Sequence, residues 1–484
     1  MKKLTRMLFA AATLAAPALW AADNGVTFIG RGEVPGNIAD KSGLTGQICQ
    51  NPADGSTCIA KTTFGGFGSA LTYTGYGNVF LAVPDRGPFD GRTNLPYLDR
   101  FHFLRMTVDT NILPISGTLN INWKLLDIDF LTNEARQNLV GDSSAFNTTN
   151  PLHNLRFDPE GVAISRDGTF FVSDEYGPFI YEFSRSGRLI RRIPVPAKFL
   201  IANPNGNLDS AGNSLELYPA NNTSGRQANR GMEGLTITPN GRYLIGIMQN
   251  ALIQDHGLNS STPPGRVGMN NRILKYDLRT RKTQEYVYTM DAVNQGRGVN
   301  EILAVNDHEF LVLERDNRTN LAGSSPNLKR IYRIDLEESG LTDVSNVASL
   351  PQLGTDLAAA NIKAVTKTKF IDLLDADYKV SATQTIKDVI AEKMEALAWG
   401  RNRSNGHYVL FVVSDNDLNT ALATQIYAFD IDPTAANIQR RAQYLPEPLF
   451  YGGDGDDWHR DSDDWDRDRH DRDDDDRDND DRDR

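Results

Sequence analysis

The chain has 484 residues, of which 39% are hydrophobic and 24% are charged. This apolar content is enough for a substantial core, so a wholly disordered protein is excluded, and the 40 glycines and 22 prolines favour a turn-rich β protein. The formal net charge is −12. No strongly basic surface is indicated, and we therefore expect no nucleic-acid partner.

The first 22 residues predict a secretory signal peptide. Met1–Arg6 is basic, Leu8–Trp20 is apolar, and the small residues Ala21 and Ala22 follow. The apolar stretch is shorter than the roughly 20 residues that a membrane-spanning helix needs. No other segment qualifies, so we expect no stable membrane insertion. We expect a periplasmic or secreted protein, cut after Ala21 or Ala22.

Only two cysteines remain in the mature chain, Cys49 and Cys58. They flank a short turn-rich segment, and in an oxidising compartment such a pair is expected to form a disulfide that closes a surface loop. A metal-binding or redox pair is the alternative. It has less support, because there is no C-x-x-C motif and no histidine nearby.

Residues 23–451 contain a repeated pattern of short strands. Each copy has an acidic start, a tight turn such as Pro239–Gly241, a very apolar second strand, and often an alternating third strand such as Ile331–Asp335. The copies are Phe157–Phe183, Met232–Asn250, Val299–Arg318, Lys393–Asn419 and a divergent Phe67–Pro88. Repeated antiparallel units of this kind predict an all-β fold, a β-propeller with long loops between the strands.

The number of blades is predicted as five to seven, with six favoured. Five copies are readable, and the strands near Val26–Ile29 and Leu119–Asp129 would complete a sixth blade. Ala358–Asp388 is expected to hold short helices or loops. A β-sandwich, or two unrelated β domains, is the competing architecture. It accounts for the strands but not for the repeated acidic start.

The acidic starts predict a cation site. The innermost strands of a propeller line its channel, so residues at equivalent positions form a ring, and clustered carboxylates repel one another unless a cation neutralises them. Ca²⁺ fits best because it accepts many oxygens in loose geometry. The predicted metal ligands are Glu160, Asp174, Glu233, Glu301, Glu395 and Asp415. Alternatively, these carboxylates accept backbone N–H groups and only stabilise the blades.

Arginines stand beside the same turns and suit a phosphate-bearing substrate, since the guanidinium fork matches phosphate oxygens. They are Arg86, Arg230, Arg315 and Arg318. We expect Glu160 and Glu233 to act in catalysis with Arg230 and Arg315, which would hold phosphate. The chain has no G-x-S-x-G, H-E-x-x-H or P-loop motif, and its histidines show no metal-binding spacing.

The last 33 residues, 452–484, have low complexity. They contain 17 Asp against 7 Arg, a net charge of −10. Such a segment cannot bury enough apolar surface to fold, so we predict a disordered, solvated tail. Weak binding of divalent cations, with His459 and His470 as ligands, is the alternative.

Four segments resemble the phytase-like family described as "esterase-like activity of phytase". They are FDPEGVAISRDGTFFVSDEYGPFIYEF, NRGMEGLTITPNGRYLIGIMQNALIQD, NEILAVNDHEFLVLERDNR and EKMEALAWG with VVSDND. The resemblance covers roughly Phe64–Asp432 and implies an exported β-propeller with phosphoester hydrolase activity.

Two hypotheses for the function follow. One is a Ca²⁺-dependent phosphoester hydrolase acting on a small phosphorylated substrate. The other is a non-catalytic binding or scaffold propeller of the cell envelope, in which the acidic ring serves stability.

Overall fold

The structure is a computed structural model that describes residues 25–50, 57–90, 95–143, 155–202, 222–291, 297–443 and 445. The predicted signal peptide and the predicted Asp/Arg-rich tail lie outside these residues, and both stay predictions. Within the described part, no helix is both long and apolar enough to cross a membrane.

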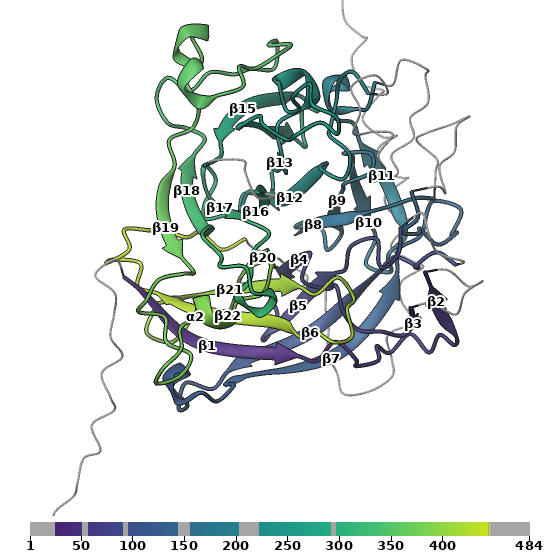
Figure 1. Cartoon of the computed structure of the whole chain (residues 1–484), viewed down its shortest axis with the longest axis vertical. Helices are drawn as coiled ribbons and strands as arrows, with labels where there is room; N and C mark the ends of the chain where they lie inside the picture. The colour runs from purple at the N-terminus through teal and green to yellow at the C-terminus, as the bar shows by residue number, and fades with distance from the viewer. Residues whose placement is uncertain are drawn as a thin grey trace, which may run out of the picture.

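The described strands confirm an all-β propeller, which has five blades around one centre (Figure 1). Each blade is an antiparallel four-stranded sheet. From the innermost strand outwards, the first blade is β4 (Ala70–Tyr73), β5 (Val79–Val83), β6 (Arg100–Val108) and β7 (Ile121–Phe130), and the second is β8 (Pro159–Ile164), β9 (Phe170–Asp174), β10 (Ile180–Phe183) and β11 (Leu189–Ile193). The third is β12 (Met232–Ile237), β13 (Tyr243–Met248), β14 (Asn270–Asp277) and β15 (Thr283–Thr289), and the fourth is β16 (Gly298–Ala304), β17 (Glu309–Arg315), β18 (Lys329–Asp335) and β19 (Thr368–Asp372). The last blade is β20 (Lys393–Trp399), β21 (Tyr408–Asp415), β22 (Thr424–Ile431) and β1 (Val26–Val34).

The preference for six blades was wrong, although five lies within the predicted range. Val26–Ile29 belongs to β1, which pairs with β22 as the outermost strand of the last blade. Leu119–Asp129 overlaps β7, the outermost strand of the first blade. These two strands are therefore the fourth strands of existing blades. The β1–β22 pairing joins the first strand of the chain to the last and closes the ring.

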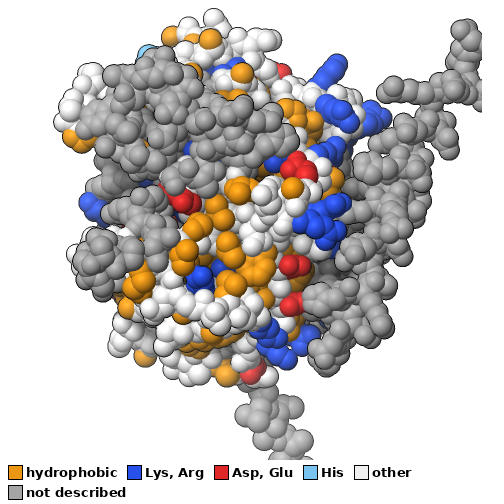
Figure 2. All heavy atoms as spheres, turned by 90° about the vertical axis from the view of Figure 1, so that its right-hand side faces the viewer, with side chains coloured by type: hydrophobic (Ala, Val, Ile, Leu, Met, Phe, Trp, Pro, Cys, Tyr) orange, Lys and Arg blue, Asp and Glu red, His pale blue; other side chains and the backbone are white. Residues whose placement is uncertain are grey.

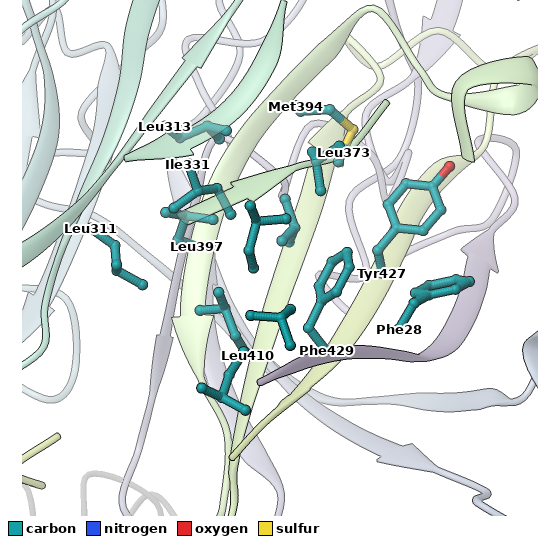
Figure 3. Packing of buried hydrophobic residues seen from close by; sticks show 14 of the residues in the cluster. Phe28, Leu311, Leu313, Ile331, Leu373, Met394, Leu397, Leu410, Tyr427 and Phe429 are labelled. Carbon is teal, nitrogen blue, oxygen red and sulfur yellow. The ribbon is translucent and has the colours of Figure 1, made fainter. Parts of the chain in front are cut away.

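The core consists of separate apolar clusters, one between each pair of neighbouring blades. Between the last two blades, for example, Phe28 and Phe429 pack with Leu313 and Ile331 (Figure 3). The other four interfaces are built in the same way. Because both faces of most blades are covered, the second strands read as continuous apolar runs, as in Val79–Val83.

The remaining elements lie in the connections between strands. A two-stranded hairpin, β2 (Gln47–Cys49) with β3 (Cys58–Ala60), carries the Cys49–Cys58 disulfide and confirms that prediction. Ala358–Asp388 contains short helices, as expected, but also β19. The helices within the described residues are η1 (Pro114–Ser116), η3 (Ala197–Phe199), η4 (Ile253–Asp255), η5 (Asn320–Ala322), η6 (Gly354–Asp356), η7 (Ala358–Ala360) and α2 (Ile386–Val389).

The side of the molecule drawn in Figure 2 carries basic and acidic groups among apolar ones. Many carboxylates are buried instead, and several of them gather at the centre of the ring.

Candidate functional site

Irregular pairing near the start of three innermost strands accompanies three acidic side chains at the centre of the ring. The register of β12 on β13 skips Glu233, and that of β20 on β21 skips Glu395. The register of β8 on β9 skips Glu160 together with the next residue. Because a bulged residue is not held in the ladder, its side chain can be re-aimed. All three carboxylates line the same cavity.

The glycine after two of these residues is required by the close approach of neighbouring innermost strands. A Cβ atom on Gly161 would lie 2.5 Å from the backbone nitrogen of Leu235. One on Gly234 would lie 2.6 Å from the backbone nitrogen of Ile302. The repeated Glu-Gly pair thus combines a carboxylate that faces the cavity with a residue that lets the next blade approach.

Glu301 is not among the residues that line the cavity. In the β16–β17 register the skipped residue is Asn300, so Glu301 stays in the ladder. Its carboxylate accepts the backbone N–H of Leu235 at 3.2 Å and that of Ile302 at 2.9 Å. Because successive strand residues point to opposite faces, this shift of one residue places Asn300 beside Glu233.

Residues that follow the second strands complete the cavity, which encloses about 120 Å³. Asp85 and Arg86 follow β5, Glu175 follows β9, and Gln249 follows β13. Every lining residue is charged or carries an amide: Asp85, Arg86, Glu160, Glu175, Asn229, Arg230, Glu233, Gln249, Arg315, Asn317, Glu392, Lys393 and Glu395. Six of these are acids and four are bases, so negative charge is in excess.

Three overlapping groups of carboxylates are close enough to share a cation. They are Asp85–Asp415–Asp417, Asp85–Asp158–Glu160 and Glu160–Glu175–Glu233. Within each group the candidate ligand oxygens lie within 4.8 Å of one another. Since Asp85 and Glu160 each belong to two groups, the carboxylates form one continuous row, which we call the carboxylate row.

The residues of the carboxylate row fit a divalent cation. Two buried oxygens of the row, Glu233 Oε2 and Asp415 Oδ2, have no hydrogen-bond partner in the described part of the chain. A cluster of carboxylate oxygens is the donor set that Ca²⁺ and Mg²⁺ bind. An oxygen buried without a partner costs free energy, and a bound cation would remove that cost.

Burial disfavours ionisation of the carboxylates in the carboxylate row. It raises the pKa of Asp85 and that of Asp158 to about 7, although Arg86 lowers both. Burial also raises the pKa of Glu160 and that of Glu233 well above the usual range, and neighbouring carboxylates raise both further. The charged forms therefore need a nearby positive charge.

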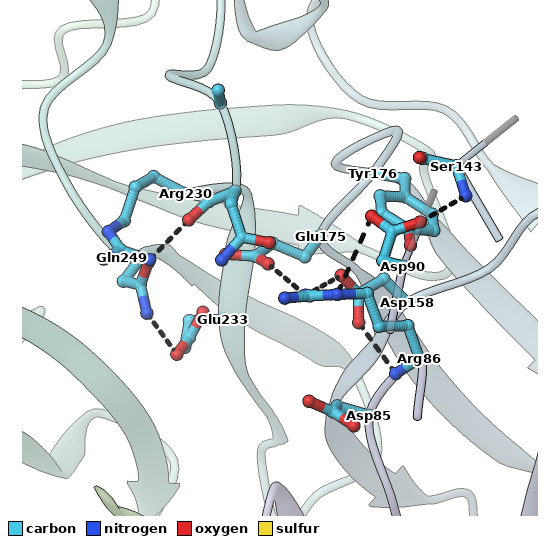
Figure 4. A network of polar contacts seen from close by, with 12 residues as sticks. Asp85, Arg86, Asp90, Ser143, Asp158, Glu175, Tyr176, Arg230, Glu233 and Gln249 are labelled. Carbon is cyan, nitrogen blue, oxygen red and sulfur yellow. Dashed lines mark hydrogen bonds and ion pairs between the residues drawn. The ribbon is translucent and has the colours of Figure 1, made fainter. Parts of the chain in front are cut away.

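Arg86 supplies part of that positive charge from within the protein (Figure 4). Its Nη1 lies 2.7 Å from Asp158 Oδ2 and 3.4 Å from Glu175 Oε2. Burial opposes the charge of the guanidinium, but Asp158 and other acids raise the pKa of Arg86 well above its ordinary value. Arg86 thus acts as a fixed counter-ion to the middle of the carboxylate row.

Lys393 and Arg315 neutralise the acids of the last blade. Lys393 Nζ contacts Asp417 and lies 3.7 Å from Asp415 Oδ2. Arg315 forms an ion pair with Glu395. At the other end of the carboxylate row Glu175 lies near Arg86, but Glu160 and Glu233 form no ion pair with a described residue. The Glu160–Glu175–Glu233 end is therefore less compensated than the Asp415–Asp417 end, where both aspartates lie near Lys393.

Glu233 is oriented by two amide side chains. Gln249 Nε2 donates to Glu233 Oε1 at 2.5 Å, and Asn300 Nδ2 donates to the same oxygen at 2.8 Å. Oε2 is left as the atom that can take a proton or a cation. Sequence reasoning missed both amides. Their positions carried a signal, because Gln249 follows its strand as Glu175 does, and Asn300 takes the place of the bulged acid.

The other predicted ligands have different surroundings. The Asp174 carboxylate accepts the backbone N–H groups of Asp158, Tyr176 and Gly177, which is the structural role considered as the alternative. Glu395 lines the cavity but is paired with Arg315, and Asp415 belongs to the end held by Lys393. Sequence reasoning also missed Asp158 as a candidate ligand, although it directly precedes the Pro-Glu of its copy.

A family model described as "Phytase-like: Esterase-like activity of phytase" matches residues 62–418, and the chain belongs to this family. A relative from Arthroderma benhamiae, named an uncharacterized secreted protein, is 29% identical over 364 residues. The match covers 63% of this chain and 65% of that relative, so the chain spans just under two thirds of the relative's length.

Two solved structures show weaker likeness. PorZ, a surface component of the type-IX secretion system of Porphyromonas gingivalis, is 14% identical, covering 78% of this chain and 37% of its own, with a TM-score of 0.30. YCF48 bound to a D1 peptide is 9% identical, covering 75% of this chain and 77% of its own, with a TM-score of 0.28. Likeness at this level carries no information about function.

Proposed function

We propose that the protein is an exported, cation-dependent phosphoester hydrolase that acts on a small phosphorylated substrate. The observation that carries this proposal is the carboxylate row, with the unpartnered Glu233 Oε2 at its least compensated end. Arginines that border the cavity add donors suited to phosphate. Membership of the phytase-like family supports the reaction class, and the name of the fungal relative supports export.

Ca²⁺ is the proposed cation because it accepts about six to eight oxygens in loose geometry. Glu160, Glu175 and Glu233 would hold it, with Asp85 and Asp158 as neighbouring ligands. When bound, such a cation supplies positive charge for phosphate oxygens and makes water a stronger acid.

The chain's own residues then divide the remaining tasks. Gln249 and Asn300 fix Glu233 so that Oε2 is the oxygen that would bind the cation. Glu160 lies in the same group of carboxylates and is the candidate for proton transfer. Arg230 is assigned to the phosphate. Arg315 is assigned mainly to compensating the charge of Glu395.

The competing function is a non-catalytic binding or scaffold propeller. The ion pairs of Arg86, Arg315 and Lys393 favour it, because they already neutralise part of the cavity. A panel of phosphomonoesters and phosphodiesters separates the two, assayed with Ca²⁺, with a chelator, and after Ca²⁺ is restored. We expect turnover that the chelator abolishes and that Glu233→Gln lowers about a hundredfold or more. Cation binding without turnover of any ester would favour the binding propeller.

A further inference from the structure

Arg230 and Arg266 differ from the other cations near the cavity in having no carboxylate partner among the described residues. Arg230 Nη1 donates to the backbone oxygen of Asn229 at 2.5 Å. Arg266 Nη2 donates to the backbone oxygen of Ala228 at 3.1 Å, and Arg266 Nε is buried without a partner. Since a guanidinium has five N–H donors, each arginine keeps several that no acid of the described chain uses.

Both side chains reach the same turn. Gln227 and Arg230 are bridged across it, and Asn229 has a left-handed backbone with φ 51°. Left-handed residues other than glycine cost free energy and occur often where a ligand is held. Asn229 lines the cavity, and its Oδ1 is buried without a partner.

The two arginines form a positive pair that makes no close ion pair with a described carboxylate, although Glu175 attracts both of them and Glu233 attracts Arg230. Burial and then the charge of Arg230 lower the pKa of Arg266 to about 10, against the opposing effect of Glu175, so the side chain remains charged at neutral pH. Arg230 lines the cavity together with Glu175 and Glu233. Arg230 therefore stands beside the less compensated end of the carboxylate row, where the proposed cation would bind, and Arg266 lies behind it, near enough to interact electrostatically with Glu175.

We propose that Arg230 and Arg266 form an anion subsite that takes the phosphate group of the substrate. The identity of that substrate rests on the proposed function, whereas the subsite itself rests on the unpaired guanidinium groups. Arg86 and Arg315 are less suited to this role because each forms an ion pair with a carboxylate, Asp158 and Glu395 respectively. The sequence-based prediction had named Arg315 as the partner of Arg230 and had not considered Arg266.

Calorimetric titration of the full chain with inorganic phosphate tests the subsite directly. We expect Arg230→Gln and Arg266→Gln each to weaken binding about tenfold or more, a change of about 1.4 kcal/mol per tenfold. Arg266→Lys should give an intermediate affinity, because it keeps the charge but loses the fork. The control is Arg242→Gln, which removes a partly exposed arginine paired with Asp277 in the third blade and should leave binding unchanged.

A thermal melt without phosphate separates a binding role from a structural one. Arg266→Gln removes one of two like charges, so its melting temperature without phosphate should equal or exceed that of the wild type. Added phosphate should raise the melting temperature of the wild type more than that of Arg266→Gln. A lower melting temperature together with unchanged phosphate affinity would overturn the subsite. So would absence of phosphate binding by the wild type at millimolar concentration.

Turnover separates this inference from the proposed function. If esters are hydrolysed, Arg266→Gln should raise KM more than it lowers kcat, and an unchanged KM would refute the subsite while leaving the hydrolase intact. If no ester is hydrolysed but phosphate binding still requires both arginines, the subsite stands and the proposed function fails.

Discussion

Lys393 supplies part of the positive charge that balances the carboxylates of the cavity. Its ammonium contacts Asp417 and lies 3.7 Å from Asp415 Oδ2, whereas Glu160 and Glu233 at the other end of the carboxylate row form no ion pair with a described residue. Burial opposes the charge on Lys393, but Glu395 and the two aspartates raise its pKa well above the ordinary value. The chain thus supplies a permanent cation at one end and leaves the other end for a ligand.

Replacing Lys393 with methionine should leave Asp415 and Asp417 without their counter-ion, so that a bound Ca²⁺ would take its place. In chelator we expect the free energy of unfolding to fall by about 1–3 kcal/mol, less than the roughly 3–5 of a fully buried pair because Lys393 is partly exposed. Ca²⁺ should restore more stability to this variant than to the wild type. Urea unfolding with and without Ca²⁺ measures both quantities. A loss that Ca²⁺ does not reduce would contradict this account of Lys393.

At the scale of the strands, short sequence patterns predicted the site only in part. The Glu-Gly pairs of Glu160 and Glu233 were recognised because one copy repeats the other. Glu301 does not line the cavity because the bulge of β16 falls one residue earlier, on Asn300, and a bulge is defined by its pairing with the next strand. The periodicity of one strand carries no information about which residues of the next strand it pairs with.

Other site residues were missed because they meet only through packing between blades. Asp158 was missed because its partner Arg86, which the sequence analysis named, belongs to a different blade. Arg266 lies in the connection between β13 and β14, and only its hydrogen bond to the backbone of Ala228 brings it to the turn that carries Arg230. The blade count was misjudged for a related reason. β1 reads as a strand in the sequence, but its membership of the last blade depends on a partner, β22, about 400 residues away.

Asp40 joins the segment before the first blade to that blade through an ion pair, and its contribution to the free energy of unfolding should depend on pH. Asp40 Oδ2 lies 2.6 Å from Arg100 Nη1, and both side chains are fully buried. Burial opposes ionisation, but His102, Arg100 and Ser42 lower the pKa of Asp40 from 3.8 to about 2. A lowered pKa stabilises the fold above the unfolded value of 3.8, and the contribution is lost as the pH falls through about 2.

Asp40→Asn should therefore cost about 2.5 kcal/mol of stability, since each pKa unit corresponds to about 1.4 kcal/mol. The difference from the wild type should be constant between about pH 8 and pH 5 and should shrink between about pH 4 and pH 2. Chemical unfolding at several pH values measures it. A difference that stays the same down to about pH 2 would show that Asp40 acts by packing alone.

For the whole molecule, closure of the ring depends on β1. Phe28 on β1 is 7% exposed, and its ring centroid lies 5.5 Å from that of Phe429 and 6.1 Å from that of Tyr378 (Figure 3). The cluster around it joins the fourth blade to the last one. The outermost strand of the last blade thus stabilises the contact between two blades and the ladder of its own sheet.

Phe28→Ala should destabilise the protein by about 3–5 kcal/mol, the usual cost of truncating a buried phenylalanine. Phe28 is not among the residues that line the cavity, so cation binding should be unchanged in the folded variant. Differential scanning calorimetry and Ca²⁺ titration give the two values. A cost below about 1 kcal/mol would mean that the ring does not depend on this contact.

The central claim is that the carboxylate row binds a divalent cation at its Glu160–Glu175–Glu233 end. The most direct test is the Ca²⁺-induced rise in melting temperature of the full-length protein, compared with that of Glu233→Gln. A ligand that binds only the folded state stabilises it by about 2.7 kcal/mol at a hundredfold excess over Kd. Both proteins carry the same Asp-rich segment at residues 452–484, so Ca²⁺ bound there affects them equally. The account predicts a clear rise for the wild type, a smaller one with Mg²⁺, and a reduced or absent one for Glu233→Gln, whereas equal rises in both proteins, or none in either, would contradict it.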